Sequence, residues 1–385
     1  MKIIYKLLFL FLLTIGYSSC DFLDIVPDEI TTEADAFKDR NAAKNFVYSC
    51  YGYLPQSNVA SGSLDLLTGD EVITAFEHET FASFPKGNYT ASSPVISYWN
   101  TFFQGLRQCY IFLENVDKVP DLTESVKTDY IAQVKFLIAY YHYQLARCYG
   151  PIILIKELPD VNASQAEYLP RTSYDECVDW ICNLLDEAAS SLPAIRTNKE
   201  DYGLATSVGA KAVKAKMLLY AASPLFNGNS SFYSNFTDKS GSQLMPLTYD
   251  PNKWVKAKTA IKEAIDLAEQ NGHALYVKQD YKIGNEDANP YPAAGPVRCL
   301  RTSLVDWDSR NPEVLLAETR SEGSYGIQNK SLPFVTDGWA WNGVGPTWTM
   351  LNRFYTKNGL PWDEDPEYKD KDKLKIVNVD ASHAD

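Results

Sequence analysis

Histidine is scarce in this sequence, and positive charge is in deficit. The 385 residues include four His, which limits His-based metal sites and catalytic centres. Lys and Arg number 36 against 49 Asp and Glu, and the formal net charge is −13. Because phosphate binding depends on clustered Lys and Arg, this balance argues against a nucleic-acid-binding protein. It argues equally against a basic patch that binds anionic lipid.

Familiar catalytic and metal-binding motifs are missing as well. His78-Glu79 begins like a zinc-protease motif, but Ala82 stands where the second His would be. The sequence has no CxxC pair and no GxSxG, and its one glycine-lysine stretch lacks the spacing of a phosphate-binding loop. His142 lies on a Tyr-rich helical stretch, which favours a packed histidine over a catalytic base. We therefore predict no catalytic residue, no metal site and no cofactor.

The N-terminus carries an apolar run that is too short to cross a membrane. Leu7–Tyr17 has eleven residues, whereas a bilayer requires about 20. The run follows a short basic leader and precedes Ser18-Ser19-Cys20, a pattern that resembles a bacterial lipoprotein cleavage site. Cleavage before Cys20 would free a thiol and an amine for acylation, and several acyl chains anchor a protein stably. We predict an exported lipoprotein; an ordinary signal peptide with an incidental cysteine is the alternative.

Hydrophobic residues recur with a helical period through much of the chain. The predicted helices span 38–54, 94–116, 124–149, 173–191, 207–222 and the stretch between Pro251 and Gly272. Gly150-Pro151 is a stop signal for the third helix, and Ser173 with Glu176 matches a capping box at the start of the fourth. The helices come in pairs with small residues on their facing sides, which favours a tetratricopeptide-like array.

The composition changes after residue 272. Residues 280–345 are rich in Gly, Pro, Asn and aromatic residues, and Pro312–Ala317 is predicted as a short strand or helical turn. Large aromatic side chains are less expected in loops than in helical cores, so they indicate a binding surface. For the helical residues Trp99, Trp254 and Trp348, packing in the core is the favoured interpretation.

An ordered series of motifs resembles the SusD/RagB family of outer-membrane nutrient-binding lipoproteins. The motifs are Cys20–Pro27, Cys50–Pro55, Gln133–Tyr143, Tyr149–Ile153, Leu169–Thr172, Lys211–Ser223, Asn311–Val314 and Pro346–Pro361. Each is weak alone, but together they cover nearly the whole chain in order. Two features depart from the family pattern. Gln133 stands where an Arg is usual, and the chain stops soon after the Asn358–Pro361 motif, so it resembles a C-terminally truncated member.

The resemblance implies a mainly α fold, with a right-handed tetratricopeptide-like helical array and a loop-rich second lobe. It divides the chain into a signal peptide (1–19), a helical region (20–272) and a ligand-binding lobe with the start of the C-terminal region (273–385). It further implies a protein lipidated at Cys20 that sits on the outer membrane and faces the cell exterior. Family members capture oligosaccharides, or in some cases peptides, and deliver them to a SusC-like TonB-dependent transporter.

Family glycan sites lie on loops around the segment that includes Asn311–Val314 and on an early loop. The rings that fit as sugar platforms are Tyr291, Tyr325, Trp339 and Trp341, and the polar candidates are Asp70, Asn88 and Tyr89. A rigid aromatic ring matches the flat apolar face of a sugar, and polar side chains satisfy its hydroxyl rim. The alternative for the two tryptophans is that they close the core between the lobes.

Two other functions compete with glycan capture. One is a helical-repeat adaptor lipoprotein that binds protein partners alone, against which the loop aromatics argue. The other is an exported glycosidase with paired carboxylates drawn from Asp70-Glu71 or Asp363–Asp365. Loop-capping or solvated acids are the favoured interpretation of both clusters.

Overall fold

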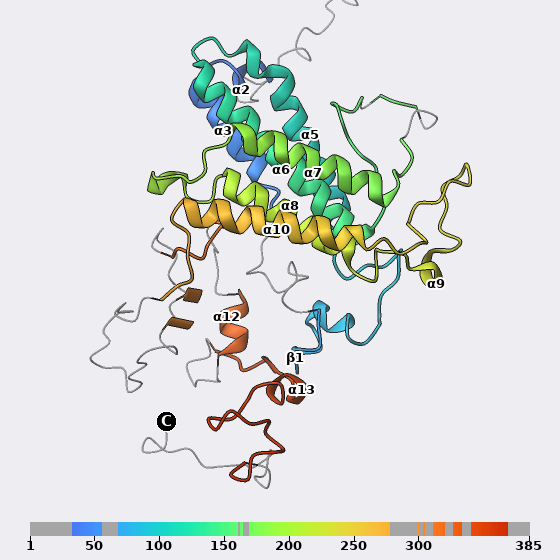
Figure 1. Ribbon diagram of the computed structural model, residues 1–385. Helices are drawn as coiled ribbons and strands as arrows, with labels where there is room; N and C mark the ends of the chain where they lie inside the picture. Colours follow the sequence, from blue (N-terminus) through green and yellow to red (C-terminus); the bar gives the residue numbers. More distant parts are fainter. Residues whose placement is uncertain are drawn as a thin grey trace, which may run out of the picture.

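The structure, a computed structural model, describes residues 33–55, 68–160, 162–164, 169–277, 299–300, 303–304, 311–319, 326–332 and 340–368. The long helices of that part of the chain are α3 (Arg40–Tyr51), α5 (Trp99–Asn115), α6 (Glu124–Tyr149), α7 (Tyr174–Ser191), α8 (Ser207–Ala222) and α10 (Asn252–Gln270) (Figure 1). The short helices are α2 (Glu33–Ala36), η3 (Thr80–Ser83), η4 (Val116–Lys118), η6 (Lys199–Asp201), α9 (Ser230–Tyr233), α12 (Gly326–Ser331) and α13 (Trp348–Leu351). The strands are β1 (Val72–Thr74) and β2 (Val344–Pro346).

The long helices pack against one another in chain order. Contacts run from α3 to α5, α5 to α6, α6 to α7, α7 to α8 and α8 to α10, as Figure 1 shows. The predicted mainly α fold with a tetratricopeptide-like array is therefore confirmed. The domain boundaries after residues 19 and 272 stay predictions. Within the described residues, no helix combines the length and the apolar character that crossing a bilayer requires.

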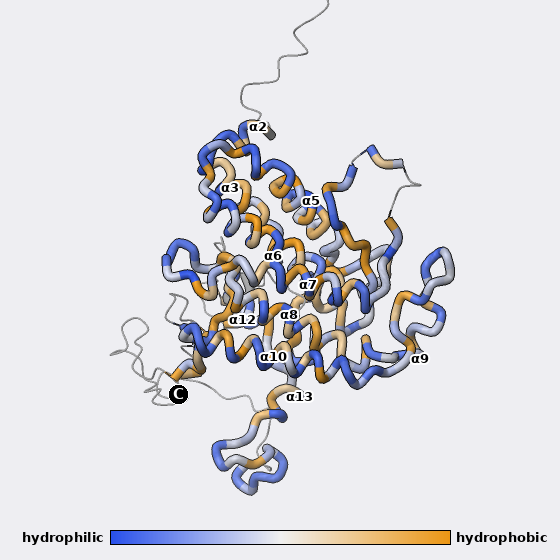
Figure 2. Tube along the Cα trace, turned by 45° about the horizontal axis from the view of Figure 1, so that its top comes forward, coloured by the Kyte–Doolittle hydropathy of each residue, from blue (hydrophilic) through white to orange (hydrophobic). Residues whose placement is uncertain are grey.

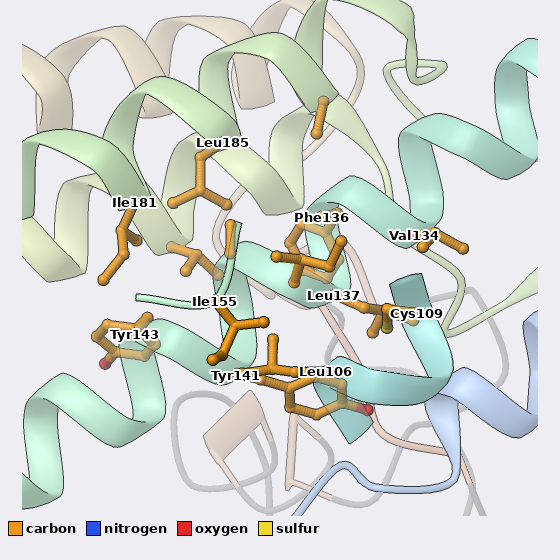
Figure 3. Close-up of a cluster of buried hydrophobic side chains, with 14 of the residues drawn as sticks. Leu106, Cys109, Val134, Phe136, Leu137, Tyr141, Tyr143, Ile155, Ile181 and Leu185 are labelled. Atoms are coloured by element: carbon orange, nitrogen blue, oxygen red, sulfur yellow. The ribbon is translucent and has the colours of Figure 1, made fainter. Parts of the chain in front are cut away.

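The core of the array is built around α6, which contacts both α5 and α7. Leu137 and Tyr141 are fully buried, and their side chains point toward those of Leu106 and Cys109 from α5 (Figure 3). The hydroxyl of Tyr141 donates to the carbonyl of Cys50 at 2.5 Å, which joins α6 to α3. Because other helices cover α6 on several sides, it lacks the continuous polar face of an ordinary surface helix.

His142 extends this core to the chain segment that follows α6. The side chain is completely buried, with Nδ1 2.8 Å from the carbonyl of Ile138 and Nε2 accepting from the N–H of Ile155 at 3.1 Å. Burial lowers its pKa to about 4, so the ring is neutral at neutral pH and its Nδ1–H donates to Ile138. The interpretation of His142 as a packed histidine is confirmed.

The helices begin and end where the sequence signals predict, but the capping hydrogen bonds that these signals imply do not always form. Gly150 adopts a φ of 70° directly after α6, a conformation that glycine reaches without steric cost. Ser173 is the N-cap of α7, yet its side chain makes no capping hydrogen bond, so the predicted capping box is wrong in that contact. The first turn is tied instead to the loop before α10, because the N–H of Tyr174 donates to the carbonyl of Leu244 at 2.8 Å.

The segment from Asn311 to Thr319 leads from the array to the second lobe. It forms a turn at Pro312 and Glu313 followed by a bend, so of the two structures predicted for Pro312–Ala317 the strand is wrong, and a single turn is present at its start. Asn311 explains the turn, because its Oδ1 accepts from the N–H of Glu313 at 3.0 Å, a local bond that competes with a strand ladder. The carbonyl of Pro312 accepts from the N–H of Ala274 at 3.3 Å, which fixes this segment beside the end of α10.

The second lobe joins an early loop to the end of the described chain. β1 and β2 pair in antiparallel fashion, with Val72 opposite Pro346 and Thr74 opposite Val344. Phe81 and Val344 form a small buried cluster there, and Val72 packs against it. The segment after α13 extends away from the array and is mostly hydrophilic (Figures 1 and 2). A helical scaffold with a loop-rich second lobe is thus present in the structure.

Candidate functional site

The described residues include part of the predicted glycan site. Tyr291, Tyr325, Trp339 and the lipidation residue Cys20 lie outside the described residues and stay predictions. Trp341, Asp70, Asn88 and Tyr89 are all described, and all four are exposed. They belong to two stretches, the early loop around β1 and the segment that precedes β2.

Trp341 stands on a backbone that is fixed to α12. Its N–H donates to the carbonyl of Asn329 at 2.8 Å, that of Asn342 to Leu332 at 2.8 Å, and that of Gly343 to Lys330 at 2.7 Å. The last carbonyls of a helix lack partners within the helix, so these three bonds satisfy the end of α12. The side chain of Trp341 is 42% exposed, which is incompatible with a ring sealed in a core between the lobes. A rigid ring is therefore presented on a rigid backbone.

Phe76 of the early loop packs directly against this turn. A Cβ built on Gly343 would lie 1.7 Å from Cε2 of Phe76, so only glycine allows this approach. The ring of Phe76 also stacks on that of His78, and the two ring centroids lie 5.3 Å apart. The sequence did not predict a role for Gly343 or Phe76, because a loop sequence has no pattern that indicates a contact between a glycine and an aromatic ring.

A buried acid lies next to this contact. The side chain of Glu79 is 5% exposed and forms an ion pair with Lys330 of α12. The Nε2 of His78 lies 3.4 Å from the same carboxylate and is itself largely exposed. The sequence drew attention to Glu79 only as part of an incomplete zinc-protease motif. In the described residues, no group of three or more His, Cys, Asp or Glu side chains could hold a metal ion.

Asp70 lies at the opposite end of the β1–β2 ladder from Trp341. Its backbone carbonyl accepts from the hydroxyl of Thr347 at 2.7 Å. Its carboxylate lies 3.5 Å from Nη2 of Arg353, and both side chains are more than half exposed. Such an exposed pair adds little stability and leaves both groups accessible to a ligand. The ladder therefore connects Asp70 and Trp341 without placing them side by side.

Asn88 and Tyr89 lie on the loop that follows η3. The N–H of Asn88 donates to the carbonyl of Ser83 at 2.9 Å, which closes a tight turn. The side chain of Tyr89 is 51% exposed, and its ring centroid lies 5.1 Å from that of Phe84. A tilted aromatic pair of this kind holds the Tyr89 ring in a defined orientation. Tyr89 is thus a second accessible ring of the early loop.

The acidic run near the end of the described chain has a local role. Asp365 is 1% exposed, and its carboxylate accepts from the hydroxyl of Thr356, from Nδ2 of Asn358 at 3.0 Å and from the N–H of Glu367 at 2.8 Å. The hydrogen bond from Thr356 is the main cause that lowers the pKa of Asp365. The interpretation of this acid as loop-capping is confirmed.

The three helical tryptophans differ from one another. Trp99 packs on the core and meets the ring of Tyr149 edge-on at 5.2 Å, as predicted. Core packing is wrong for Trp254 and Trp348, whose side chains are 42% and 45% exposed. Helical periodicity did not reveal this, because α10 buries its alanines against α8 and leaves Trp254 beside them at the surface.

A groove of about 780 Å³ lies on the helical array, between α3, the first half of α6 and the link from α7 to α8. At the groove, Arg196 donates two hydrogen bonds to the carboxylate of Asp129, from Nη2 at 2.8 Å and from Nη1 at 3.2 Å. Nε2 of Gln133 donates to the same carboxylate at 2.7 Å. Gln133, which stands where the family pattern usually has Arg, thus hydrogen-bonds to Asp129, while Arg196 forms the ion pair with that carboxylate. These polar groups satisfy one another's hydrogen bonds. They therefore have a structural role, which is to join α6 to the segment between α7 and α8.

The fold places this chain in the class of helical-repeat proteins with a loop-rich second lobe. A family model described as starch-binding and associating with the outer membrane matches residues 21–219, more than half of the chain. The chain belongs to this SusD-like family.

Solved structures and a curated relative agree with this assignment. The protein BT4246 is 30% identical with a TM-score of 0.72 over 86% of this chain and 59% of its own. A SusD-like protein from Bacteroides fragilis shares the fold at 20% identity, with a TM-score of 0.63 over 87% of this chain and 56% of its own. The SusD-like protein P25 of Formosa agariphila is 23% identical over 230 residues, 56% of this chain and 43% of that protein. The chain thus spans about half the length of the relatives it matches.

Proposed function

We propose that this protein is a surface lipoprotein that captures oligosaccharide without catalysis and delivers it to a SusC-like TonB-dependent transporter. The observation that carries the proposal is Trp341, a tryptophan ring 42% exposed on a backbone held by two hydrogen bonds to α12 and one to Leu332, directly after it. A sugar ring gains from such a platform because little conformational entropy is lost on binding. The family description as starch-binding supports a glycan as the ligand.

The polar groups of the early loop fit the same function. Asp70 and Arg353 offer an acceptor and donors at the surface, and Tyr89 offers a second ring with a hydroxyl. These groups are spread along one lobe, which suits a chain of sugars better than a single small molecule. Tyr291, Tyr325 and Trp339 are further proposed platforms of this lobe, and Asn88 a further polar contact.

The binding test uses a matched pair of tryptophans. Trp341 and Trp254 have the same exposed fraction, 42%, but lie on the second lobe and on the array respectively. We expect Trp341→Ala to weaken retention on native gels containing starch or another recognised polysaccharide by about tenfold or more, a typical cost of losing a buried ring at an interface. Trp254→Ala should bind as the wild type does. Equal losses in both variants, or no retention of the wild type on a panel of polysaccharides, would refute the proposal.

Anchoring and transport are tested separately. Cys20→Ala should move the protein from the outer-membrane fraction to the soluble fraction if Cys20 carries the lipid. Pull-down of the lipidated protein from detergent-solubilised outer membranes should recover a SusC-like transporter. Recovery of glycan binding without a transporter would leave a glycan-binding protein and reject the delivery step.

An adaptor that binds only protein is the second candidate. A mainly apolar groove of about 400 Å³ on α8 and α10, lined in part by Leu219, Trp254 and Ile265, favours it. In that case Trp254→Ala, rather than Trp341→Ala, should abolish the capture of a cross-linked protein partner from the outer membrane, and a glycan array should show no binding.

A further inference from the structure

Glu79 is a buried carboxylate in a lobe that has little apolar core. Its side chain is 5% exposed, whereas the apolar cluster of the described lobe is formed by Phe81 and Val344 with Val72 against them. Burying a carboxylate is costly unless a partner neutralises it and hydrogen-bonds to it. Two side chains approach its Oε1: Nζ of Lys330 forms an ion pair with it, and Nε2 of the largely exposed His78 lies 3.4 Å away. Lys330 is the partner that comes from outside the early loop.

Lys330 connects two parts of the site through one residue. Its Nζ forms the ion pair with Glu79, and its backbone carbonyl accepts from the N–H of Gly343 at 2.7 Å. The first contact reaches the start of η3 in the early loop, and the second reaches the turn that carries Trp341. Lys330 also lies in the last turn of α12, where a positive charge complements the helix dipole.

The contact of Phe76 with Gly343 lies on the same junction. The Phe76 ring occupies the space that a Cβ on Gly343 would need, so the early loop and the Trp341 turn are closely packed there. A shift of α12 away from Glu79 would therefore move the three carbonyls that hold residues 341–343. The ion pair and the turn that carries Trp341 thus share one residue, Lys330.

We propose that Glu79 and Lys330 are positioning residues of the ligand site, which fix α12 and thereby set the place of the Trp341 ring relative to the early loop. The proposal rests on the proposed function for the role of Trp341. Neither residue needs to touch the ligand, because the pair acts through the backbone of residues 341–343.

The experiment compares charge removal with charge conservation. Lys330→Met keeps the length of the side chain and removes its charge, Lys330→Arg keeps the charge, and Glu79→Gln removes the acid. Lys262→Met is the matched control, because Lys262 pairs with Asp266 at 2.8 Å on the exposed surface of α10. Two quantities are measured for the intact protein: the affinity for the polysaccharide that the wild type binds best, and the amide hydrogen exchange of residues 341–343.

We expect Lys330→Met and Glu79→Gln each to weaken binding about tenfold and to speed exchange at residues 341–343 by a similar factor, the range for partners in one contact network. Lys330→Arg and Lys262→Met should resemble the wild type in both measurements. The double variant Glu79→Gln/Lys330→Met should lose no more than the worse single variant, because both remove the same contact.

Wild-type exchange at residues 341–343 in Lys330→Met would overturn the positioning role, and so would additive losses in the double variant. Faster exchange without weaker binding would show that the pair holds the turn but does not set affinity, which also rejects the proposal. If the wild type binds no polysaccharide, the proposed function fails, while the exchange measurement still decides whether the pair positions Trp341.

Discussion

The helical array and the second lobe are held together by different forces. In the array, fully buried side chains such as Leu137, Tyr141 and Ile181 interlock between successive helices. In the lobe, a short ladder, three backbone bonds at residues 341–343 and the Glu79–Lys330 pair fix the chain. Apolar burial tolerates few changes of volume, whereas loops fixed by a few polar contacts accept new side chains at exposed positions. Apolar burial thus stabilises mainly the array, and the proposed ligand site lies in a separate region, the second lobe.

The sharpest test of this comparison is a cavity in the array. Leu137→Ala removes a fully buried side chain from α6, so it should lower the free energy of unfolding by about 2–5 kcal/mol. Urea denaturation followed by far-ultraviolet circular dichroism measures this change. The control is Leu219→Ala on α8, whose side chain is 41% exposed, and which should stay within about 0.5 kcal/mol of the wild type. Comparable losses of unfolding free energy in the two variants would mean that buried apolar side chains do not dominate the stability of the array.

Acid should weaken the array through His142. The pKa of this residue is about 4 in the folded protein against 6.5 for the ordinary value. Above pH 6.5 the ring is neutral in both states. As the pH falls below 6.5 the unfolded chain binds a proton that the folded chain does not, so the free energy of unfolding should drop by about 3 kcal/mol by pH 4. The measurement is urea denaturation at several pH values.

The matched variant for this test is a histidine replacement. His142→Gln keeps a donor and an acceptor but does not titrate, so its stability should fall less between pH 7 and pH 4 than that of the wild type. If His142→Gln falls as steeply as the wild type, other groups cause the acid sensitivity.

The smallest of these effects is expected in the second lobe. Gly343→Ala places a Cβ against the ring of Phe76, and such overpacking typically costs about 1–3 kcal/mol. Because the lobe lies outside the helical core, the loss should appear as faster hydrogen exchange at β1 and β2 rather than as a change in helix content. Gly345→Ala is the control, since its Cβ would meet no atom within 4 Å. Unchanged exchange in Gly343→Ala would show that the lobe deforms freely.

The sequence predicted the array well because periodicity and helix stop signals report on it directly. The predicted ranges 124–149 and 207–222 coincide with α6 and α8. The capping contact of Ser173 and the burial of Trp254 were wrong, because both depend on what a neighbouring segment covers. A single sequence records the face of a helix but not whether another element lies on that face.

The site was predictable only in outline. The aromatic loops pointed to the second lobe, and Trp341 is indeed exposed there. The Glu79–Lys330 contact was not foreseen, because Glu79 precedes η3 and Lys330 lies in the short helix α12, far apart in the chain, and no period links the two residues. A contact of this kind becomes visible only when the ladder between β1 and β2 is known.

That ladder has a consequence for the order of assembly. The hydroxyl of Thr347 bonds to a residue 277 positions earlier, whereas the helices of the array mostly meet their neighbours in sequence. Long-range closure is slow compared with local pairing. Newly synthesised chains should therefore acquire their full helix content before β1 pairs with β2, and a protease acting in that interval would release a folded helical array without the second lobe.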